Sequence, residues 1–341
     1  MVNWDFTKYS PNEILDQLIA TNLPAWITPY CEFLKEFIQK EKFIVQTSGT
    51  TGNKKKITVT KQQMLYSARA TLTYFNLTKG KTVLLPLSCE FIAGKMMLVR
   101  AIEGKLNLFI VKPTTNFNSL NIQKIDFCPL VPLQVEGLLN SPFIKRINVM
   151  LIGGGAVPLS LIKKLRDVKS CAFESFGMTE TLTHFALRMV SPKKEDYFTT
   201  LPGFRIDISE KNELILLENK LNPNALKTND LIEKYSSTQF KWIGRSDHLI
   251  KSGGILFVPE EIEHKISKHI FQPFVIIGVK NPKFGEVIAL VVEGREKVDI
   301  HSLNKYLSKY ERIKKQFSLL SFPKTESGKV KRTLIKQIIN A

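Results

Sequence analysis

The sequence has few cysteines and no long apolar segment, and both shortages restrict what the protein can be. Its four cysteines, Cys31, Cys89, Cys128 and Cys171, lie far apart and form no CxxC pair, so neither a disulfide framework nor a thiolate metal site is expected. No apolar run approaches the roughly 18 residues of a membrane-spanning helix. The first residues also lack the basic and apolar regions of a secretion signal. We therefore expect a cytoplasmic protein without stable membrane insertion.

Acidic residues are scarce relative to basic ones. The chain has 31 Asp and Glu against 49 Lys and Arg, a formal net charge of +18, which is compatible with nucleic acid, a membrane surface or a phosphate-rich small molecule as partner. The excess is spread along the chain, with no Arg-rich tail and no basic helix stripe. We therefore expect a lysine-rich solvated surface and no nucleic-acid partner. The five histidines show no ligand spacing such as HExxH, which argues against a transition-metal site.

The length of 341 residues suffices for about two domains. Up to about residue 246, short β-type runs alternate with helical patterns, which is typical of α/β layering. Beyond it the order changes to that of a small α+β domain. The predicted domains are 1–246 and 247–341. Helices are expected at 11–20, 30–40, 60–74, 92–103, 133–139, 158–167, 259–268 and 300–310, and strands at 43–46, 56–60, 82–85, 107–111, 147–152, 171–173, 274–280, 286–293 and 317–322.

Hydroxyl, glycine and lysine residues are concentrated between two predicted strands, over Thr47–Lys56. Glycines let backbone N–H groups approach an anion, hydroxyls add donors, and lysines neutralise phosphate charge. A Walker A pattern cannot be threaded through the segment, and a polar hairpin turn is the alternative. We interpret it as a phosphate-binding loop whose candidate ligands are Thr47, Ser48, Gly49, Thr50, Thr51, Gly52 and Lys55.

This loop resembles the Thr-Ser-Gly-Thr-Thr-Gly loop of the adenylate-forming superfamily, which comprises acyl-CoA synthetases, luciferases and peptide-synthetase adenylation domains. Four further segments resemble motifs of that superfamily and occur in its order: Phe176–Glu180, Lys227–Asp230, Gly244–Glu263 and Pro323–Lys329. Within Lys227–Asp230, Asn229 replaces the family's glycine. The resemblance spans residues 43–335 and implies an α/β fold, with a large N-terminal domain of packed sheets and helices and a small mobile C-terminal α+β domain. It also implies ATP, Mg²⁺ and coenzyme A as partners, together with a small carboxylic acid.

The resemblance assigns roles to individual residues. Lys329 would lie between the acid's carboxylate and the α-phosphate, where its charge offsets the repulsion of two anions. Thr179 would contact the α-phosphate, and Glu180 would supply a hard oxygen ligand to Mg²⁺. Asp247 would be the hinge of the mobile domain. The residues implied in adenine or ribose binding are Gly154, Gly155, Ala156, Phe176, Gly177, Met178, Asp230 and Arg245.

Two features depart from the family pattern. Only 46 residues precede the phosphate loop, fewer than is usual in the family, so part of the first subdomain looks trimmed. In the stretch Pro86–Gly94, Phe91 stands where the family often carries histidine. This substitution argues against a His-gated acyl or CoA tunnel.

Within the superfamily, the stretches 92–101, 130–134, 151–158 and 177–184 resemble the o-succinylbenzoate:CoA ligases of menaquinone biosynthesis. Such a substrate needs apolar walls and a donor for its second carboxylate. The candidate residues of the acid pocket are Phe91, Gly94, Arg100, His184 and Arg188, for whose arginines and histidine a purely structural role is the alternative.

The sequence thus predicts an ATP-dependent acid:CoA ligase that acts through an acyl-adenylate. The alternatives are a ligase for another aryl or fatty acid, one that loads a carrier protein, and a non-catalytic nucleotide- or RNA-binding protein. The sequence is compatible with a homo-oligomer as well as with a monomer.

Overall fold

The computed structural model describes residues 1–19, 23–46, 56–295, 297–325 and 329–340. These residues group into two compact units, which are described separately. The first contains the residues up to 205 together with 217–225, and the second contains 206–216 and the residues from 226 onward. The predicted phosphate-loop residues Thr47–Lys55 lie outside the described residues, so their interpretation stays a prediction.

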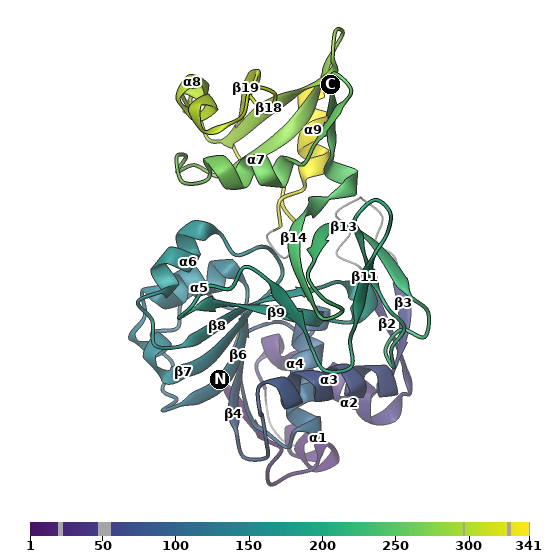
Figure 1. The fold of residues 1–341 in the computed structure, drawn as a ribbon. Helices are drawn as coiled ribbons and strands as arrows, with labels where there is room; N and C mark the ends of the chain where they lie inside the picture. Colours follow the sequence, from purple (N-terminus) through teal and green to yellow (C-terminus); the bar gives the residue numbers. More distant parts are fainter. Residues whose placement is uncertain (20–22, 47–55, 296, 326–328, 341) are drawn as a thin grey trace. The chain divides into compact units, whose positions relative to one another are not determined.

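The first unit is an α/β structure in which strands and helices alternate along the chain (Figure 1). Its elements are β1 (Val2–Asp5), α1 (Pro11–Ile19), η1 (Ala25–Ile27), α2 (Thr28–Gln39), β2 (Lys42–Gln46), β3 (Lys56–Thr60), α3 (Lys61–Tyr74), β4 (Thr82–Leu85), α4 (Ile92–Glu103), β5 (Asn107–Ile110), β6 (Ile125–Leu130), α5 (Pro132–Leu139), η2 (Pro142–Arg146), β7 (Ile147–Ile152), α6 (Leu159–Leu165), β8 (Cys171–Gly177), η3 (Thr179–Thr181), β9 (His184–Ser191) and β10 (Phe198–Thr200).

The strands of this unit form a sheet in the order β1-β5-β4-β6-β7-β8-β9-β10, and β2 pairs with β3 as a separate hairpin. Neighbours from β5 to β8 run parallel, whereas β9 returns antiparallel to β8. Met150 and Ile152 of β7 pack in one apolar core with Val135 of α5 and Leu161 of α6. Because parallel strands end at the same edge of a sheet, the loops after β7 and β8 are neighbours.

The second unit contains an antiparallel set of strands followed by a small α+β fold. Its elements are β11 (Ile206–Ile208), β12 (Glu213–Leu216), β13 (Leu226–Lys234), β14 (Gln239–Arg245), η4 (Ser246–His248), β15 (Ile250–Ser252), β16 (Ile255–Phe257), α7 (Pro259–Ile266), β17 (Phe274–Asn281), β18 (Gly285–Glu293), α8 (Ile300–Leu303), η5 (Asn304–Tyr306), β19 (Lys315–Leu319) and α9 (Arg332–Asn340).

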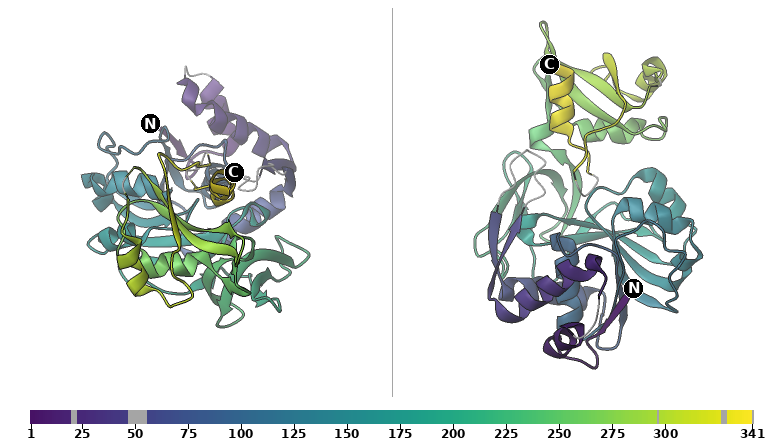
Figure 2. Two further views of the ribbon diagram at one scale, coloured as in Figure 1. Left: turned by 90° about the horizontal axis from the view of Figure 1, so that it is seen from above. Right: turned by 180° about the vertical axis from the view of Figure 1, so that it is seen from behind.

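The small sheet of the second unit is buried on both faces. Its order is β16-β15-β18-β17, and β19 pairs parallel with β18. Ile276 of β17 packs with Ile262 of α7 in one core, whereas its neighbours Val275 and Ile277 pack with Ile335 of α9 in another. Figure 2 shows α7 and α9 beside this sheet. Burial on both faces explains the almost uninterrupted apolar sequence of β17 and β18.

The predicted fold class is confirmed, and several helix starts form as the sequence predicts. The Ser10 amide donates to Glu13 at 2.7 Å while the Glu13 amide donates to the Ser10 hydroxyl at 3.3 Å. Thr60 and Gln63 form the same reciprocal cap on α3. These are capping boxes, in which side chains satisfy the backbone donors of a first helical turn.

Three predicted boundaries are wrong. The helix expected at 300–310 ends as α8 at Leu303 and continues only as η5, because the Asn304 side chain bonds to both backbone groups of Ile313. The strand expected at 171–173 continues to Gly177, where β9 pairs with it. The strand expected at 317–322 instead covers Lys315–Leu319. Tertiary pairing fixed these ends, which local sequence patterns do not encode.

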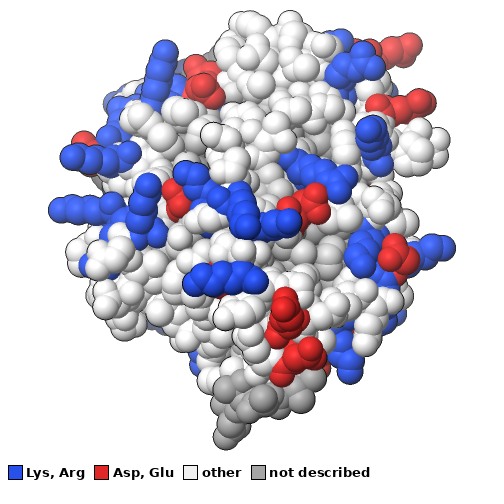
Figure 3. All heavy atoms as spheres, turned by 90° about the horizontal axis from the view of Figure 1, so that it is seen from below, with Lys and Arg blue, Asp and Glu red and all other residues white. Residues whose placement is uncertain are grey.

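Helix length and the charge on one face of the surface are two further features of the structure. Across the ranges that the structure describes, no helix is long and apolar enough to cross a membrane. On the face drawn in Figure 3, Lys and Arg lie among Asp, Glu and uncharged side chains and do not merge into one continuous patch.

Candidate functional site

Two loops predicted to bind the nucleotide base follow adjacent parallel strands of the first unit. Ile152, the last residue of β7, is the register partner of Glu174 in β8, so the glycine-rich turn after β7 lies beside the end of β8. Gly154 in that turn has φ +82°, a conformation that favours glycine. The tertiary structure therefore brings together the predicted adenine-binding segments 154–156 and 176–178.

The aromatic residue of the second segment is held edge-on by other aromatics. The Phe176 ring lies 5.6 Å from that of Phe185 and 5.3 Å from that of Phe198, centroid to centroid. Gly177 follows at a close backbone approach, since a Cβ there would lie 2.1 Å from the carbonyl oxygen of Thr183. Only glycine fits at this position, and the sequence motif has a packing reason as well as a predicted binding role.

Thr179 and Glu180, the residues predicted to contact phosphate and Mg²⁺, lie on η3. A strained turn at Leu182 ends this short helix. Leu182 has φ +62° and ψ −56°, and the Thr183 amide donates to the Thr181 carbonyl at 2.7 Å. This is the geometry of a classic γ-turn, which is rare for residues other than glycine. The turn reverses the chain within three residues, so that β9 returns alongside β8 and Thr183 faces the interior.

Arg100 and His184 lie in one buried polar cluster. Arg100 projects from α4 and is only 2% exposed, and His184 at the start of β9 is 6% exposed. The Arg100 guanidinium donates to the Thr183 hydroxyl at 3.0 Å, and the His184 Nε2 atom is 3.2 Å from the Thr71 hydroxyl. Ser67, one turn before Thr71 on α3, is 3.3 Å from the Thr183 hydroxyl.

The charge of Arg100 has no protein counter-ion among the described residues. No carboxylate there lies within ion-pairing distance of the guanidinium, and its Nε atom is buried without a hydrogen-bond partner. Burial lowers the pKa of Arg100 to about 9. Burial and the Arg100 charge hold the pKa of His184 well below its usual value, so the histidine is neutral at pH 7. A buried guanidinium of this kind would be stabilised by an anionic partner.

The other candidates for the acid pocket lie apart from this cluster. Phe91 caps the start of α4 and is 44% exposed. Arg100 lies nine positions further along the chain, which corresponds to roughly 13 Å of helix rise. Gly94 lets α4 pack against the backbone of Ser88, whose carbonyl a Cβ would approach to 2.2 Å. The Arg188 guanidinium pairs with buried Glu174 at 2.6 Å, which occupies it structurally.

The predicted ribose-binding residues are register partners in the second unit. Asp230 on β13 lies opposite Arg245 on β14, and the Arg245 Nη1 atom is 3.7 Å from the Asp230 carboxylate. The indole N–H of Trp242 donates to the same carboxylate at 3.0 Å. Gly244 lets β14 pack against Val258 and Glu260, since a Cβ there would lie 2.4 Å from a methyl group of Val258 and 2.6 Å from a carboxylate oxygen of Glu260.

Asp247 and Lys329 join this cluster. Arg245 donates two hydrogen bonds to the Asp247 carboxylate, at 2.8 and 2.9 Å. Loss of hydration and the positive charge of Arg245 lower the pKa of Lys329, although Asp230 and Asp247 act in the opposite direction. The fold thus brings Lys329 of the last motif close to Asp230 and Arg245, which belong to two motifs about a hundred residues earlier in the sequence.

Lys329 is bonded through its backbone to Thr325 and is followed closely by α9. The Lys329 amide donates to the Thr325 hydroxyl at 3.0 Å, and Arg332 at the start of α9 forms a two-pronged pair with Glu263 of α7 at 2.6 and 2.9 Å. Lys329 itself remains exposed. Its ammonium group lies near the charges of the cluster and has lost part of its hydration.

Sequence reasoning missed several polar residues of these clusters. Thr71, Thr183 and Trp242 each contact a predicted residue. Thr71 lies in a helix and Trp242 in a strand without a recognisable motif, so no local sequence pattern indicated a role for either residue. The stretch 177–184 does contain Thr183, whose role became apparent only from its contact with Arg100.

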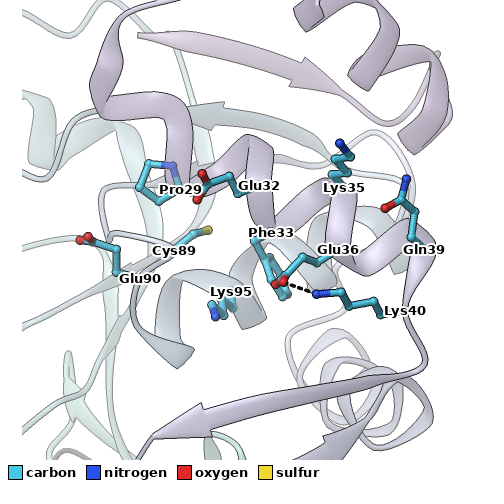
Figure 4. A pocket seen from close by; sticks show the side chains of 10 residues that line it. All are labelled: Pro29, Glu32, Phe33, Lys35, Glu36, Gln39, Lys40, Cys89, Glu90 and Lys95. Atoms are coloured by element: carbon cyan, nitrogen blue, oxygen red, sulfur yellow. Dashed lines mark hydrogen bonds and ion pairs between the residues drawn. The ribbon is translucent and has the colours of Figure 1, made fainter.

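A separate surface hollow of about 420 Å³ lies beside α2 in the first unit. Figure 4 shows that its lining side chains come from α2 and from the segment around the start of α4, with Glu36 and Lys40 joined by an ion pair of 2.6 Å. Opposite charges alternate around it, and burial raises the pKa of the Cys89 thiol. None of the predicted site residues within the described ranges lines this hollow.

The described residues offer few protein ligands for a metal. Among them, no group of three or more His, Cys, Asp or Glu gathers closely enough to hold an ion. Glu180 makes no hydrogen bond or ion pair with another described residue, so its carboxylate oxygens are available. This fits a Mg²⁺ ion that would take most of its ligands from phosphate and water.

Comparison with known proteins identifies the relatives of this chain. The family model described as AMP-binding enzyme matches residues 38–218. The 2-succinylbenzoate–CoA ligase of Lactococcus lactis is 24% identical over 93% of this chain and 75% of its own length. The enzyme of the same name from Staphylococcus epidermidis is 26% identical over 86% and 69%.

Solved structures resemble this fold over most of the chain. An acyl-CoA synthetase (AMP-forming)/AMP-acid ligase II-like protein from Dyadobacter fermentans matches with a TM-score of 0.65 and 28% identity, covering 99% of this chain and all of that one. The o-succinylbenzoate coenzyme A synthetase of Bacillus subtilis, solved with ATP and magnesium, matches with a TM-score of 0.75 and 23% identity, over 86% and 69% of the two chains. The second likeness concerns the fold alone.

Proposed function

The chain belongs to the AMP-binding enzyme family, and from this premise we propose that it is an ATP-dependent acid:CoA ligase whose acid is o-succinylbenzoate. The reaction joins the acid's carboxylate to the α-phosphorus of ATP, releases pyrophosphate, and then transfers the acyl group from AMP to the thiol of coenzyme A. The names of the relatives from Lactococcus and Staphylococcus support this substrate. The structural observation that supports this substrate is the buried guanidinium of Arg100, which has no carboxylate partner among the described residues.

The first half-reaction requires two anions to meet. Lys329 would approach both the acid and the α-phosphate, where its charge stabilises the transition state. Asp230 and Arg245 would bind the ribose hydroxyls, since a carboxylate accepts and a guanidinium donates. Thr179 would contact the α-phosphate. Glu180 would hold Mg²⁺, which when bound neutralises phosphate charge.

The acid would place its second carboxylate on Arg100. The Thr183 hydroxyl, 3.0 Å from the guanidinium, orients the arginine, and neutral His184 adds a polar wall without competing charge. A monocarboxylic acid would leave the guanidinium buried and uncompensated, which is costly. Arg100 therefore favours a dicarboxylate over benzoate or a fatty acid. Phe91 and Gly94 lie too far along α4 to share this contact and are left out of the proposed pocket.

The second half-reaction would use the family's hinge motion. We propose domains 1–246 and 247–341, with Asp247 as the pivot that first presents Lys329 and then coenzyme A to the adenylate. The bidentate pair of Arg245 and Asp247 supports this location, because it links the end of β14 to the first residues of the mobile part. We place the reaction in the cytoplasm.

ATP–pyrophosphate exchange tests the proposal. Wild-type protein is assayed with o-succinylbenzoate, benzoate, a medium-chain fatty acid and no acid, beside Lys329→Ala and the neighbouring control Lys331→Ala. We expect exchange driven by o-succinylbenzoate, a loss of about a hundredfold or more in Lys329→Ala, and near-normal exchange in Lys331→Ala. Exchange with only another acid would overturn the substrate and keep the mechanism, and no acid-dependent exchange would overturn both.

The identity of the acyl acceptor distinguishes a coenzyme A ligase from an enzyme that loads a carrier protein. After adenylate formation, coenzyme A or a phosphopantetheine carrier protein is supplied and the thioester is measured. We expect o-succinylbenzoyl-CoA to form. Transfer to the carrier protein alone would show that the enzyme loads a carrier instead.

A further inference from the structure

One end of the small sheet in the second unit carries exposed aromatic rings among exposed lysines. The loop after α7 and the turn η5 lie side by side there (Figure 1): the rings of His269 and Tyr306 stack with centroids 3.5 Å apart, and Lys265 pairs with Glu311 at 2.5 Å. We define the aromatic–lysine surface as six exposed side chains of these two segments: Lys268, Phe271, Lys305, Tyr306, Lys309 and Tyr310.

The aromatic members are unusually accessible. Phe271 is 99% exposed, Tyr310 is 64% exposed and Tyr306 is 51% exposed. Phe271 projects from the loop between α7 and β17, where the described residues provide no apolar neighbour that covers it. Leaving a whole phenyl ring in water forgoes the free energy that its burial would supply, and the ring is free to enter another apolar phase.

The charge of this surface is of one sign. Among the residues that the structure describes, Lys268, Lys305 and Lys309 form no ion pair with an acidic side chain, and Glu311 in the adjacent turn is already neutralised by Lys265. The flexible stems of lysines let their ammonium groups reach past neighbouring rings. The surface therefore attracts an anionic partner and repels a second copy of itself.

The geometry favours a lipid surface over nucleic acid or an acidic protein. One face of Tyr306 is occupied by His269, and Lys309 lies over the Tyr310 ring at 5.8 Å, so of the three rings only that of Phe271 has both faces free for stacking bases. A protein partner would need a pocket shaped for the protruding Phe271, whereas a bilayer accepts such a ring without a matching pocket. Tyrosine and lysine are also the residues that typically lie at membrane interfaces.

We propose that the aromatic–lysine surface adsorbs reversibly to anionic lipid membranes. Phe271 enters the headgroup region, Tyr306 and Tyr310 lie at its edge, and the three lysines contact lipid phosphates. This is surface adsorption and not insertion of a helix. The inference concerns a surface separate from the residues of the proposed reaction, so it stands or falls independently of the ligase activity.

Vesicle flotation with the full chain tests the proposal. Vesicles of phosphatidylglycerol and phosphatidylcholine in equal parts are compared with pure phosphatidylcholine, at low and at high salt. We expect binding to the anionic vesicles alone and its loss at high salt. Each lysine near an anionic membrane changes the partition coefficient about fivefold, so the triple variant Lys268→Glu, Lys305→Glu, Lys309→Glu should bind at least about a hundredfold more weakly. Phe271→Ala should bind about tenfold more weakly.

Matched variants distinguish this surface from general charge. The control triple Lys145→Glu, Lys163→Glu, Lys169→Glu changes the net charge equally at exposed positions of the first unit, and Leu133→Ala removes another exposed apolar side chain, 64% exposed. Both controls should float like the wild type. The proposal is overturned if the wild type does not float, if the control triple loses as much binding, or if single-stranded RNA outcompetes the vesicles. Normal far-ultraviolet circular dichroism of each variant verifies folding.

Discussion

Asp230 and Arg245 face each other across the β13–β14 pair, and the same arginine holds Asp247 through two hydrogen bonds. One guanidinium thus connects a proposed ribose ligand to a proposed hinge residue. Lys329 is electrostatically coupled to all three. A change at the hinge would therefore alter the electrostatic surroundings of the proposed catalytic lysine, and the pH dependence of the reaction reports on it.

Pyrophosphate exchange should decline at alkaline pH before an ordinary lysine titrates. Loss of hydration and the charges of Arg245 and Arg332 lower the pKa of Lys329 below 10.5. Since adenylation needs the charged form, activity is retained below this lowered pKa and lost as the pH rises through it. Exchange rates from pH 6 to 11 at subsaturating acid and ATP, which follow kcat/KM and therefore report the free enzyme, measure the midpoint. Lys329→Arg keeps its charge over this range, so any activity that it retains should lack the decline; an identical decline in both proteins would contradict the assignment.

Replacing Arg100 by methionine should weaken acid binding without weakening the fold. The Nε atom of the buried guanidinium has no hydrogen-bond partner among the described residues, so an apolar side chain of similar length should leave the free energy of unfolding equal or about 1 kcal/mol higher. The KM for o-succinylbenzoate should rise about a hundredfold, because a buried charged hydrogen-bond partner is lost. Exchange kinetics and urea unfolding measure the two effects.

A large loss of stability in Arg100→Met would contradict the role proposed for the arginine and indicate a structural one. Arg188→Met provides the matched control. Its guanidinium pairs with buried Glu174, so the substitution leaves an unpaired buried carboxylate and should destabilise the fold by about 3 kcal/mol.

Replacement by alanine should change the free energy of unfolding strongly at one glycine of the proposed adenine site and hardly at another. A Cβ at Gly177 would lie 2.1 Å from the Thr183 carbonyl oxygen, whereas at Gly155 it would meet no atom within 4 Å. Gly177→Ala must displace the β8–β9 turn and should lower the free energy of unfolding by about 3 kcal/mol. Gly155→Ala should change it by less than about 0.5 kcal/mol. Chemical denaturation of both variants measures this difference, and equal effects would rule out the close backbone approach.

The ion pair of Asp247 and Arg245 should stabilise the protein at neutral pH but not at strongly acidic pH. Burial works to raise the pKa of Asp247, but the hydrogen bonds and charge of Arg245 prevail and lower it below 3.8. A carboxylate with a lowered pKa contributes stability at pH values above 3.8, and this contribution is lost as the pH falls through the lowered pKa.

Asp247→Asn should accordingly be about 1 kcal/mol less stable than the wild type at pH 6. The difference should disappear at strongly acidic pH. Urea unfolding at both pH values measures it, with the exposed Asp167→Asn as control, and a difference independent of pH would show that the charge of Asp247 is not involved.

Local sequence patterns predicted the elements that depend on near neighbours. The capping residues Ser10 and Thr60 start helices because their partners lie three residues away. The apolar run 147–152 became β7 with its predicted bounds. The predictions were wrong where long-range pairing decided the outcome, as at Gly177, where β9 extends β8, and at Asn304, which binds Ile313 and ends α8.

The candidate site was predictable residue by residue but not as an arrangement. The order of the motifs along the chain is enough to single out Asp230, Arg245 and Lys329, and the fold brings these three residues together. Arg100 and His184 were predicted together with Phe91 and Gly94, and only the first two share a cluster. Helix geometry separates the other pair, since positions along one helix diverge by a fixed rise.

By itself, the sequence determined the family, the α/β class and the residue types that the proposed chemistry requires, because motif identity and hydrophobic periodicity are local properties of the chain. Only the tertiary structure decided which charges are compensated. Arg188 meets the buried carboxylate of Glu174 and Arg332 meets the partly buried one of Glu263, while Arg100 donates to the Thr183 hydroxyl and has no carboxylate partner among the described residues. The physical reason is that the cost of a buried charge depends on what surrounds it in space, and those surroundings come from segments far apart in the sequence.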